Sequence, residues 1–304
     1  MKTRIRIAQV AWLNTRFCVD AIVAARGSIS GDFVSTVMLA AISNSNTGYL
    51  DNRPETSRLH LGPGTITDDM RRPVNVSSLA SSLGVPRETA RLKVAGLVDR
   101  GLAERIDGGV IIPSRTLNAD PISSARQASV DAIVAFVAGL TEVEGAGMSA
   151  RQRLVPPTPA TAWGTIRLAV AHMLRVIGHA RELAPAIGFL DAYILLGVAH
   201  LTSAQLRIPT GLAEAIAPES FGARIGHVRG AAVADLVHLP EETVRRHLKQ
   251  LVDAGVLSHD TGGYDVILDG DRLIAWRDFQ AQVKVSTRQF VWKLDAAGLI
   301  ETLD

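Results

Sequence analysis

Two polar segments of this 304-residue chain carry side chains that could form hydrogen bonds with the edges of nucleic-acid bases. One is "PRETARLKVAGLVDRGL" at 86–102, and the other is "PEETVRRHLKQLVDAGVL" at 240–257. Arginine can donate two hydrogen bonds to guanine, glutamine can pair with adenine, and glutamate can accept a hydrogen bond from cytosine. The candidate residues are Arg87, Glu88, Arg91 and Lys93 in the first segment, and Glu242, Arg245, Arg246, Lys249 and Gln250 in the second.

Basic residues around these segments could contact nucleic-acid phosphates, and their number differs between the two places. The formal net charge of the chain is only +2, so such a surface would have to be local. Residues 71–115 contain eight basic and four acidic residues, whereas residues 224–268 contain five and six, with four histidines besides. We therefore expect the first region to be the stronger electrostatic anchor. The candidate phosphate contacts are Arg71, Arg72, Arg105 and Arg115.

The spacing of apolar residues predicts that each polar segment is an amphipathic helix. In the second segment, Val244, Leu248 and Leu251 follow the i, i+4, i+7 pattern of one helix face, and the first segment repeats this pattern. Pro86 and Pro240 suit the beginning of a helix, where a missing N–H group costs little. A glycine follows each helix and could end it in a left-handed conformation.

Shorter elements flank each predicted helix in the same order. A short helix precedes it, at "SSLASSLG" (77–84) and at "AAVADLVH" (231–238), with a tight turn between the two helices. Behind it come a short apolar run, a turn with paired glycines (Gly108–Gly109 in one case and Gly262–Gly263 in the other) and a β-branched run, which predicts a β-hairpin. The order of short helix, turn, longer helix and hairpin is typical of a winged helix-turn-helix.

These segments resemble the helix-turn-helix of the cyclic-AMP receptor and FNR type of bacterial transcription regulator, and similar spacing occurs in the MarR and IclR families. No cyclic-nucleotide-binding barrel is recognisable, so that ligand is not implied. The base-contacting positions that the resemblance implies are Arg87, Glu88, Glu242 and Arg246. Leu92 stands where the second segment has Arg246, and Glu241 stands where the first has an arginine. The two segments could therefore read different half-sites, or one of them could have a weakened role.

The chain as a whole reads as a duplication. At an offset of 154 residues, Thr89 falls on Thr243 and Leu97 on Leu251, and "AWLNTRFCVDAIV" (11–23) matches "AWGTIRLAVAHML" at an offset of 151. Between the copies lies a stretch rich in Gly and Pro, which is typical of a linker. We expect a mainly α fold with small β-hairpin wings (α+β), made of two duplicated winged helix-turn-helix domains. The predicted ranges are 1–145 for the first domain, 146–160 for the linker and 161–304 for the second domain.

An aromatic helical run occupies residues 273–299. Its aromatic and aliphatic members could pack on their own domain or on the sister domain, and a homodimer interface through this helix is the alternative. The residues concerned are Trp276, Phe279, Val283, Phe290 and Trp292.

Other functional classes find little support in the sequence. No nucleophile–base pair or catalytic pair of acids is recognisable, so we expect no enzyme activity, no cofactor and no metal site. His172, His179 and His200 could form a metal-sensing cluster, but packed or exposed histidines explain them better because no cysteine or carboxylate ligands accompany them. One cysteine, Cys18, and the absence of a long apolar run predict a protein of the cytoplasm. A DNA-binding protein of the cytoplasm would be located on the nucleoid.

The sequence favours a sequence-specific, double-stranded DNA-binding transcription regulator in which two winged-helix domains act as an intramolecular pseudo-dimer. No small-molecule effector can be identified. A plasmid-type replication initiator or a nucleoid-associated DNA protein is one alternative. A winged-helix scaffold for protein–protein interaction is the other.

Overall fold

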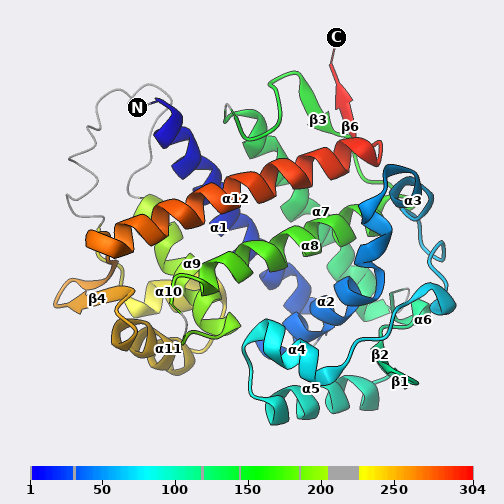
Figure 1. The fold of residues 1–304 in the computed structure, drawn as a ribbon, viewed down its shortest axis with the longest axis horizontal. Helices are drawn as coiled ribbons and strands as arrows, with labels where there is room; N and C mark the ends of the chain where they lie inside the picture. Colours follow the sequence, from blue (N-terminus) through cyan, green and yellow to red (C-terminus); the bar gives the residue numbers. More distant parts are fainter. Residues whose placement is uncertain are drawn as a thin grey trace. The chain divides into compact units, whose positions relative to one another are not determined.

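The computed structural model (Figure 1) describes residues 2–29, 32–117, 120–143, 145–184, 186–204 and 226–303. This described part of the chain is mainly α-helical, and each of its sheets consists of two short antiparallel strands. The expectation of a mainly α fold with small β-hairpins is therefore confirmed. Residues 205–225 lie outside the described part of the chain. None of the described helices combines the length and apolar character needed to cross a membrane.

The chain forms two compact units, each assembled from separate parts of the sequence. Unit 1 comprises Met1–Val19, Val143–Ala146 and Arg175–Thr287, and unit 2 comprises Asp20–Glu142, Gly147–Leu174 and Arg288–Asp304. Three long helices contribute residues to both units: α1 (Lys2–Ile29), α8 (Ala162–Arg181) and α12 (Gly270–Ala296). For this reason the compact units do not coincide with the two halves of the sequence.

Unit 2 contains the first of the two polar segments. Its elements are α2 (Phe33–Thr47), η1 (Gly48–Asn52), α3 (Pro54–Leu59), η2 (Asp68–Met70), α4 (Val76–Leu83), α5 (Arg87–Asp99), β1 (Glu104–Ile106), β2 (Gly109–Ile111), α6 (Ser114–Leu117), α7 (Asp120–Thr141), β3 (Gln152–Leu154) and β6 (Ile300–Thr302). Helix α5 packs against α4 and α2. Its contact face is apolar, and Ala90, Val94 and Leu97 are fully buried there.

Unit 1 contains the second polar segment. Its elements are α9 (Phe189–Ala204), α10 (Gly230–Val237), α11 (Glu241–Asp253), β4 (Leu257–Asp260) and β5 (Gly263–Val266), with parts of α1, α8 and α12. Helices α10 and α11 both pack on α9. Val244, Leu248 and Leu251 of α11 are fully buried, which is the inward face that the sequence pattern predicts.

The α4–β2 segment (residues 75–111) and the α10–β5 segment (residues 229–266) share several local backbone features at the offset of 154 residues. The short helix of each ends in the left-handed region, at Gly84 (φ 59°) in one case and at His238 (φ 52°) in the other. Glycine needs no special support in this conformation, whereas a residue with a Cβ atom adopts it at some cost. Each longer helix is followed by a glycine with positive φ, 70° at Gly101 and 67° at Gly255.

The two hairpins are also equivalent. Strand β1 pairs with β2, and β4 pairs with β5. A residue before the short helix adds a further antiparallel bridge to each hairpin, from Val74 to Val110 and from Val228 to Tyr264. At Gly109 of the first hairpin a Cβ atom would overlap the carbonyl oxygen of Val74, so only glycine permits this close approach.

Part of the predicted linker forms a strand. β3 is antiparallel to β6, with Gln152 opposite Thr302 and Leu154 opposite Ile300, and Arg153 of β3 forms an ion pair with Glu301. The sequence gives no signal for this strand, because three residues show no recognisable alternation and their partner lies far along the chain.

The C-terminal aromatic run forms most of α12. Trp276, Phe279, Val283 and Phe290 are buried, as expected for residues that pack in a core. Trp292 is 55% exposed. The homodimer interface through this helix stays a prediction.

Candidate nucleic-acid interface

The outer face of α5 is polar and lies opposite its buried apolar face. Arg87, Glu88 and Arg91 are exposed on it, and so is Leu92. Lys93 is directed differently: it is half-buried, and its Nζ donates a hydrogen bond of 2.8 Å to Asp32 Oδ2 at the start of α2. Because this contact ties α5 to α2, Lys93 is not one of the residues that we place at the candidate interface.

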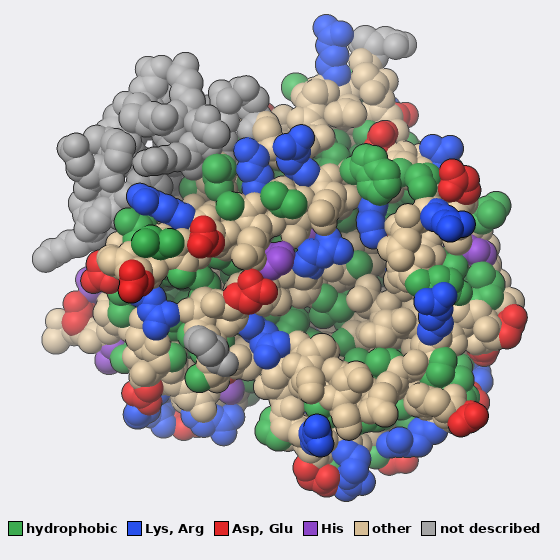
Figure 2. All heavy atoms as spheres, in the orientation of Figure 1, with side chains coloured by type: hydrophobic (Ala, Val, Ile, Leu, Met, Phe, Trp, Pro, Cys, Tyr) green, Lys and Arg blue, Asp and Glu red, His purple; other side chains and the backbone are tan. Residues whose placement is uncertain are grey.

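The outer face of α11 carries more hydrogen-bonding groups than that of α5. Glu242, Arg245, Arg246, Lys249 and Gln250 are all exposed. Figure 2 shows basic and acidic side chains mixed over the segments labelled α11 and α5 in Figure 1.

The two helices share an ion pair at equivalent positions. Arg91 donates from Nε and an Nη atom to both carboxylate oxygens of Glu88, at 2.8 and 2.6 Å. Arg245 donates in the same way to Glu242, at 2.8 and 2.7 Å. These hydrogen bonds hold the pKa of both glutamates below the ordinary value. Both arginines are thus held in a fixed orientation, but a phosphate or base would have to compete with the carboxylate for them.

Arg87 of α5 and Arg246 of α11 lack such a partner. Both side chains are exposed, and neither forms a hydrogen bond or ion pair with another of the described residues. Lys249 differs because its Nζ lies 2.7 Å from Asp253 Oδ2, in an exposed pair. These two guanidinium groups are therefore donors that no described carboxylate engages in a hydrogen bond or ion pair.

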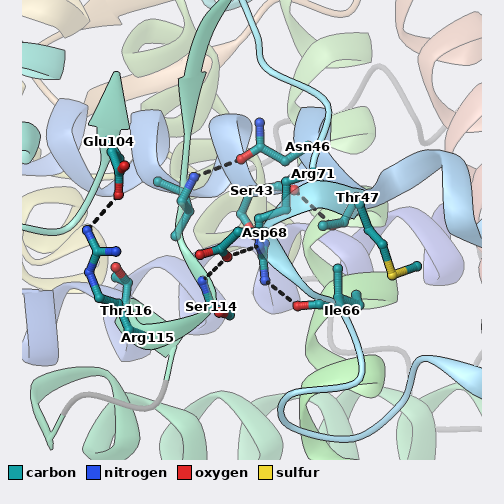
Figure 3. A network of polar contacts seen from close by, with 12 residues as sticks. Ser43, Asn46, Thr47, Ile66, Asp68, Arg71, Glu104, Ser114, Arg115 and Thr116 are labelled. Carbon is teal, nitrogen blue, oxygen red and sulfur yellow. Dashed lines mark hydrogen bonds and ion pairs between the residues drawn. The ribbon is translucent and has the colours of Figure 1, made fainter. Parts of the chain in front are cut away.

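Arg71 is a correction to the predicted phosphate contacts. It is only 4% exposed, its Nε lies 3.3 Å from Asp68 Oδ1, and it donates a hydrogen bond of 3.4 Å to the Ile66 carbonyl (Figure 3). Burial lowers the pKa of Arg71, and the Asp68 carboxylate opposes this effect. A phosphate in solution cannot reach a guanidinium enclosed in this way, so Arg71 supports the loop before α4 rather than binding DNA.

The other three predicted phosphate contacts are exposed. The Arg72 guanidinium lies 3.9 Å from the centre of the Tyr49 ring, and Arg115 forms an ion pair of 2.7 Å with Glu104 of β1. Arg105, also on β1, makes no ion pair or side-chain hydrogen bond with another described residue. Arg105 is therefore the phosphate candidate with the fewest internal commitments.

Asn46 of α2 fixes the first hairpin relative to α2, which the sequence analysis did not anticipate. Its Nδ2 donates to the carbonyls of Arg72 (2.7 Å) and Val110 (3.1 Å), and its Oδ1 accepts from the Ile112 N–H at 2.9 Å. Figure 3 shows this side chain pointing toward strand β2 and its neighbours. Since Asn46 is fully buried, these hydrogen bonds satisfy each of its polar atoms in a site that excludes water.

His247 fixes α11 in unit 1 and was also missed. Its Nδ1 lies 2.6 Å from Asp191 Oδ1 on α9, and the other oxygen of Asp191 accepts a hydrogen bond from the Gly188 N–H. The pair is almost enclosed, with 13% of the histidine and 11% of the aspartate side chain exposed. A polar residue on the flank of an amphipathic helix gives no sign in the sequence that its partner is 56 residues away.

Among the described residues, no group of three or more His, Cys, Asp or Glu side chains is placed to hold a metal ion. His172 stacks between Phe136 and Phe290, His179 contacts Ser286, and His200 stacks on Trp12. In the second hairpin, His259 stacks on Tyr264. These histidines are held mainly by ring stacking and single hydrogen bonds.

Comparisons of the chain with models of protein families, with curated proteins and with solved structures found no match.

Proposed function

We propose that this protein binds double-stranded DNA in a sequence-specific manner through α5 and α11, and that it regulates transcription. In this proposal the α4–β2 and α10–β5 segments are two copies of a winged helix-turn-helix, with α5 and α11 as the recognition helices. The observation that carries the proposal is the repetition, in two segments, of a helix after a turn whose inner face is buried and whose outer face presents an exposed Glu–Arg pair.

The equivalence of the two segments supports a common origin. The left-handed turn residue, the proline before the longer helix, the glycine after it and the extra bridge in the hairpin all recur at the same offset. A packing requirement alone would preserve the buried face. The recurrence of Glu88–Arg91 as Glu242–Arg245 on the exposed face supports a role outside the domain core.

The size and chemistry of the two outer faces fit the major groove of DNA. This groove admits one α-helix, and its base edges present the donors and acceptors that arginine and glutamine recognise. We assign base contacts to Arg87, Arg246 and Gln250. Phosphate contacts fall to Arg72, Arg105 and Arg115 around the first helix, where the local charge is most positive. Arg91 and Arg245 would contribute after exchanging their glutamate partner for DNA.

Two recognition helices in one polypeptide would let the protein read two half-sites without a second chain. Covalent linkage raises the effective concentration of the second contact once the first has formed, so two weak interactions can give tight binding. This arrangement favours a regulator located on the nucleoid. A replication initiator would instead bind repeated sites at an origin, an architectural protein would bind broadly, and a protein-interaction scaffold would show no affinity for DNA at low salt.

The proposal is tested with the full-length protein and a random library of duplex DNA. Repeated selection should enrich one motif, and the enriched duplex then serves as the probe in fluorescence anisotropy. Arg87→Ala and Arg246→Ala should each weaken binding by about 1–3 kcal/mol, the usual contribution of an arginine that contacts a base. Arg153→Ala is the matched control, because Arg153 is an exposed arginine outside both segments.

The results separate the candidate functions. An enriched motif whose binding depends on Arg87 and Arg246 supports a sequence-specific regulator. Enrichment without loss in either variant would move the reading face elsewhere on the protein. Failure to bind any duplex at low salt would contradict the proposed function.

A further inference from the structure

The outer faces of α5 and α11 differ in chemistry at three equivalent positions. In each helix these positions are spaced i, i+3 and i+4, so they lie side by side on one face. They hold Leu92, Ala95 and Gly96 in α5, and Arg246, Lys249 and Gln250 in α11. One helix therefore presents an uncharged apolar patch at the place where the other presents three polar side chains.

Packing within the protein does not explain the apolar patch of α5. The buried residues of the two helices correspond to one another, so both have the same inward face. Leu92 is 56% exposed, although it is a large apolar residue. Beside it, Ala95 and Gly96 are half-buried, and a Cβ atom placed on Gly96 would meet no atom within 4 Å apart from the backbone of its own helix. The patch is thus open, and a partner could approach the helix closely there.

The surroundings of the patch indicate an anionic partner. Arg87 and the Glu88–Arg91 pair lie on the N-terminal side of Leu92. Asp99 and Arg100 lie on the C-terminal side, where Arg100 Nε donates to the Gly96 carbonyl, so the patch has three basic and two acidic neighbours. A partner that matches this surface would carry negative charges opposite the basic residues and a small apolar group opposite Leu92. In the major groove of DNA, the 5-methyl group of thymine is the apolar group on a base edge.

We propose that Leu92 is a specificity-determining residue that contacts the 5-methyl group of a thymine, and that α5 and α11 consequently read different half-sites. This inference rests on the proposed function, because it requires α5 to enter the major groove. Leucine has no hydrogen-bonding group, so α5 selects thymine by apolar contact at the position where α11 uses Arg246 to donate hydrogen bonds. The target is an asymmetric pair of half-sites rather than a palindrome.

The test replaces single thymines by uracil in the duplex that the full-length protein selects. This exchange removes one methyl group and leaves the hydrogen-bonding groups of the base unchanged. At one thymine the wild-type protein should lose affinity by about fourfold, the factor expected for one buried methyl-sized group. Leu92→Ala should bind the thymine and uracil duplexes equally well. Leu92→Arg, which gives α5 the residue of α11, should change the preferred base at that position to guanine.

The control is Leu59→Ala, which removes a 72% exposed leucine outside the α4–β2 segment and should keep the thymine preference. Because both leucines are exposed, their variants should retain the circular dichroism spectrum of the wild type. The inference alone fails if the protein selects a motif but uracil has no effect at any position, or if Leu92→Ala still discriminates. The proposed function fails together with it if no duplex is bound at all. Binding of a protein through the Leu92 patch without DNA binding would also overturn the inference.

Discussion

Individual arginines of the candidate interface have different roles, although their sequence surroundings look similar. Arg71 is enclosed by Asp68 and the Ile66 carbonyl, whereas Arg105 is exposed on β1. A guanidinium contributes to phosphate binding only where it can displace counterions from DNA. Burial therefore separates Arg71 from the exposed arginines, although all of them count equally in the local charge.

This division gives a prediction for salt dependence. Arg105→Ala should reduce the slope of log Kd against log salt concentration by about one, because one phosphate contact is lost. Arg71→Ala should leave that slope unchanged but lower the free energy of unfolding, since it leaves Asp68 without its buried partner. The slopes come from anisotropy titrations at several salt concentrations, and the stability from urea unfolding. An unchanged slope for Arg105→Ala would remove Arg105 from the interface.

The start of helix α2 is stabilised by a carboxylate that also holds α5. Asp32 caps the helix by accepting hydrogen bonds from the N–H and hydroxyl groups of Ser35, and it accepts another from Lys93. Burial by itself raises the pKa of Asp32, but these hydrogen bonds bring it below its ordinary value. A lowered pKa means that the folded state favours the charged carboxylate, which is the form that the cap and Lys93 require.

The sign of the pH effect follows from this shift. The stabilisation is fully present above the unfolded-state pKa of aspartate, about 4, and is lost as the pH falls through the lower pKa of the folded state. Asp32→Ala should cost about 0.5–2 kcal/mol at neutral pH, the usual value of an N-cap, and less in acid. Asp32→Asn keeps a capping side chain and should lose less. Urea unfolding at neutral and acid pH measures both, and an equal cost of Asp32→Ala at both pH values would contradict the role of the charged form.

Two glycines of α8 provide a matched test of helix packing. A Cβ atom on Gly164 would lie 2.8 Å from the Leu61 Cα atom, whereas one on Gly178 would meet no other atom within 4 Å. Gly164→Ala should destabilise the protein by about 1–3 kcal/mol through overpacking. Gly178→Ala should stabilise it by up to about 1 kcal/mol, because alanine has the higher helix propensity. Thermal unfolding checks the signs, and a stabilising Gly164→Ala would show that Leu61 moves freely away from α8.

Elements whose signals are local could be predicted from the sequence. The helices α5 and α11 follow from their apolar spacing, and each hairpin follows from an apolar run, paired glycines and a β-branched run. Contacts between distant residues could not be predicted in this way. The buried Arg167–Asp51 ion pair joins residues 116 apart, and β3 finds its partner only at β6. Likewise, nothing near Arg71 in the sequence indicates that its side chain is buried.

The whole molecule has only a small net charge, so the proposed affinity for DNA must come from local surfaces rather than from general attraction. The charge is also divided unequally between the two segments. We therefore expect α5 to anchor the complex, with α11 adding specificity through Arg246 and Gln250. In this account, one chain reads the two half-sites that a symmetric regulator reads with two identical subunits. Because α5 and α11 are separate segments of one chain, their residues can differ.

The central claim is that both α5 and α11 lie on DNA, and tethered cleavage tests it most directly. Burial raises the pKa of the Cys18 thiol and leaves it unreactive, so a cysteine introduced at Asp99 or at Asp253 can be labelled alone with a DNA-cleaving iron chelate. These two exposed positions are equivalent, one near the end of each helix. On the selected duplex, each labelled protein should cut at one half-site, and the two half-sites should be different. Uniform cutting along the duplex would contradict the account. So would labels on both helices that cut no more than a control label placed at Arg153.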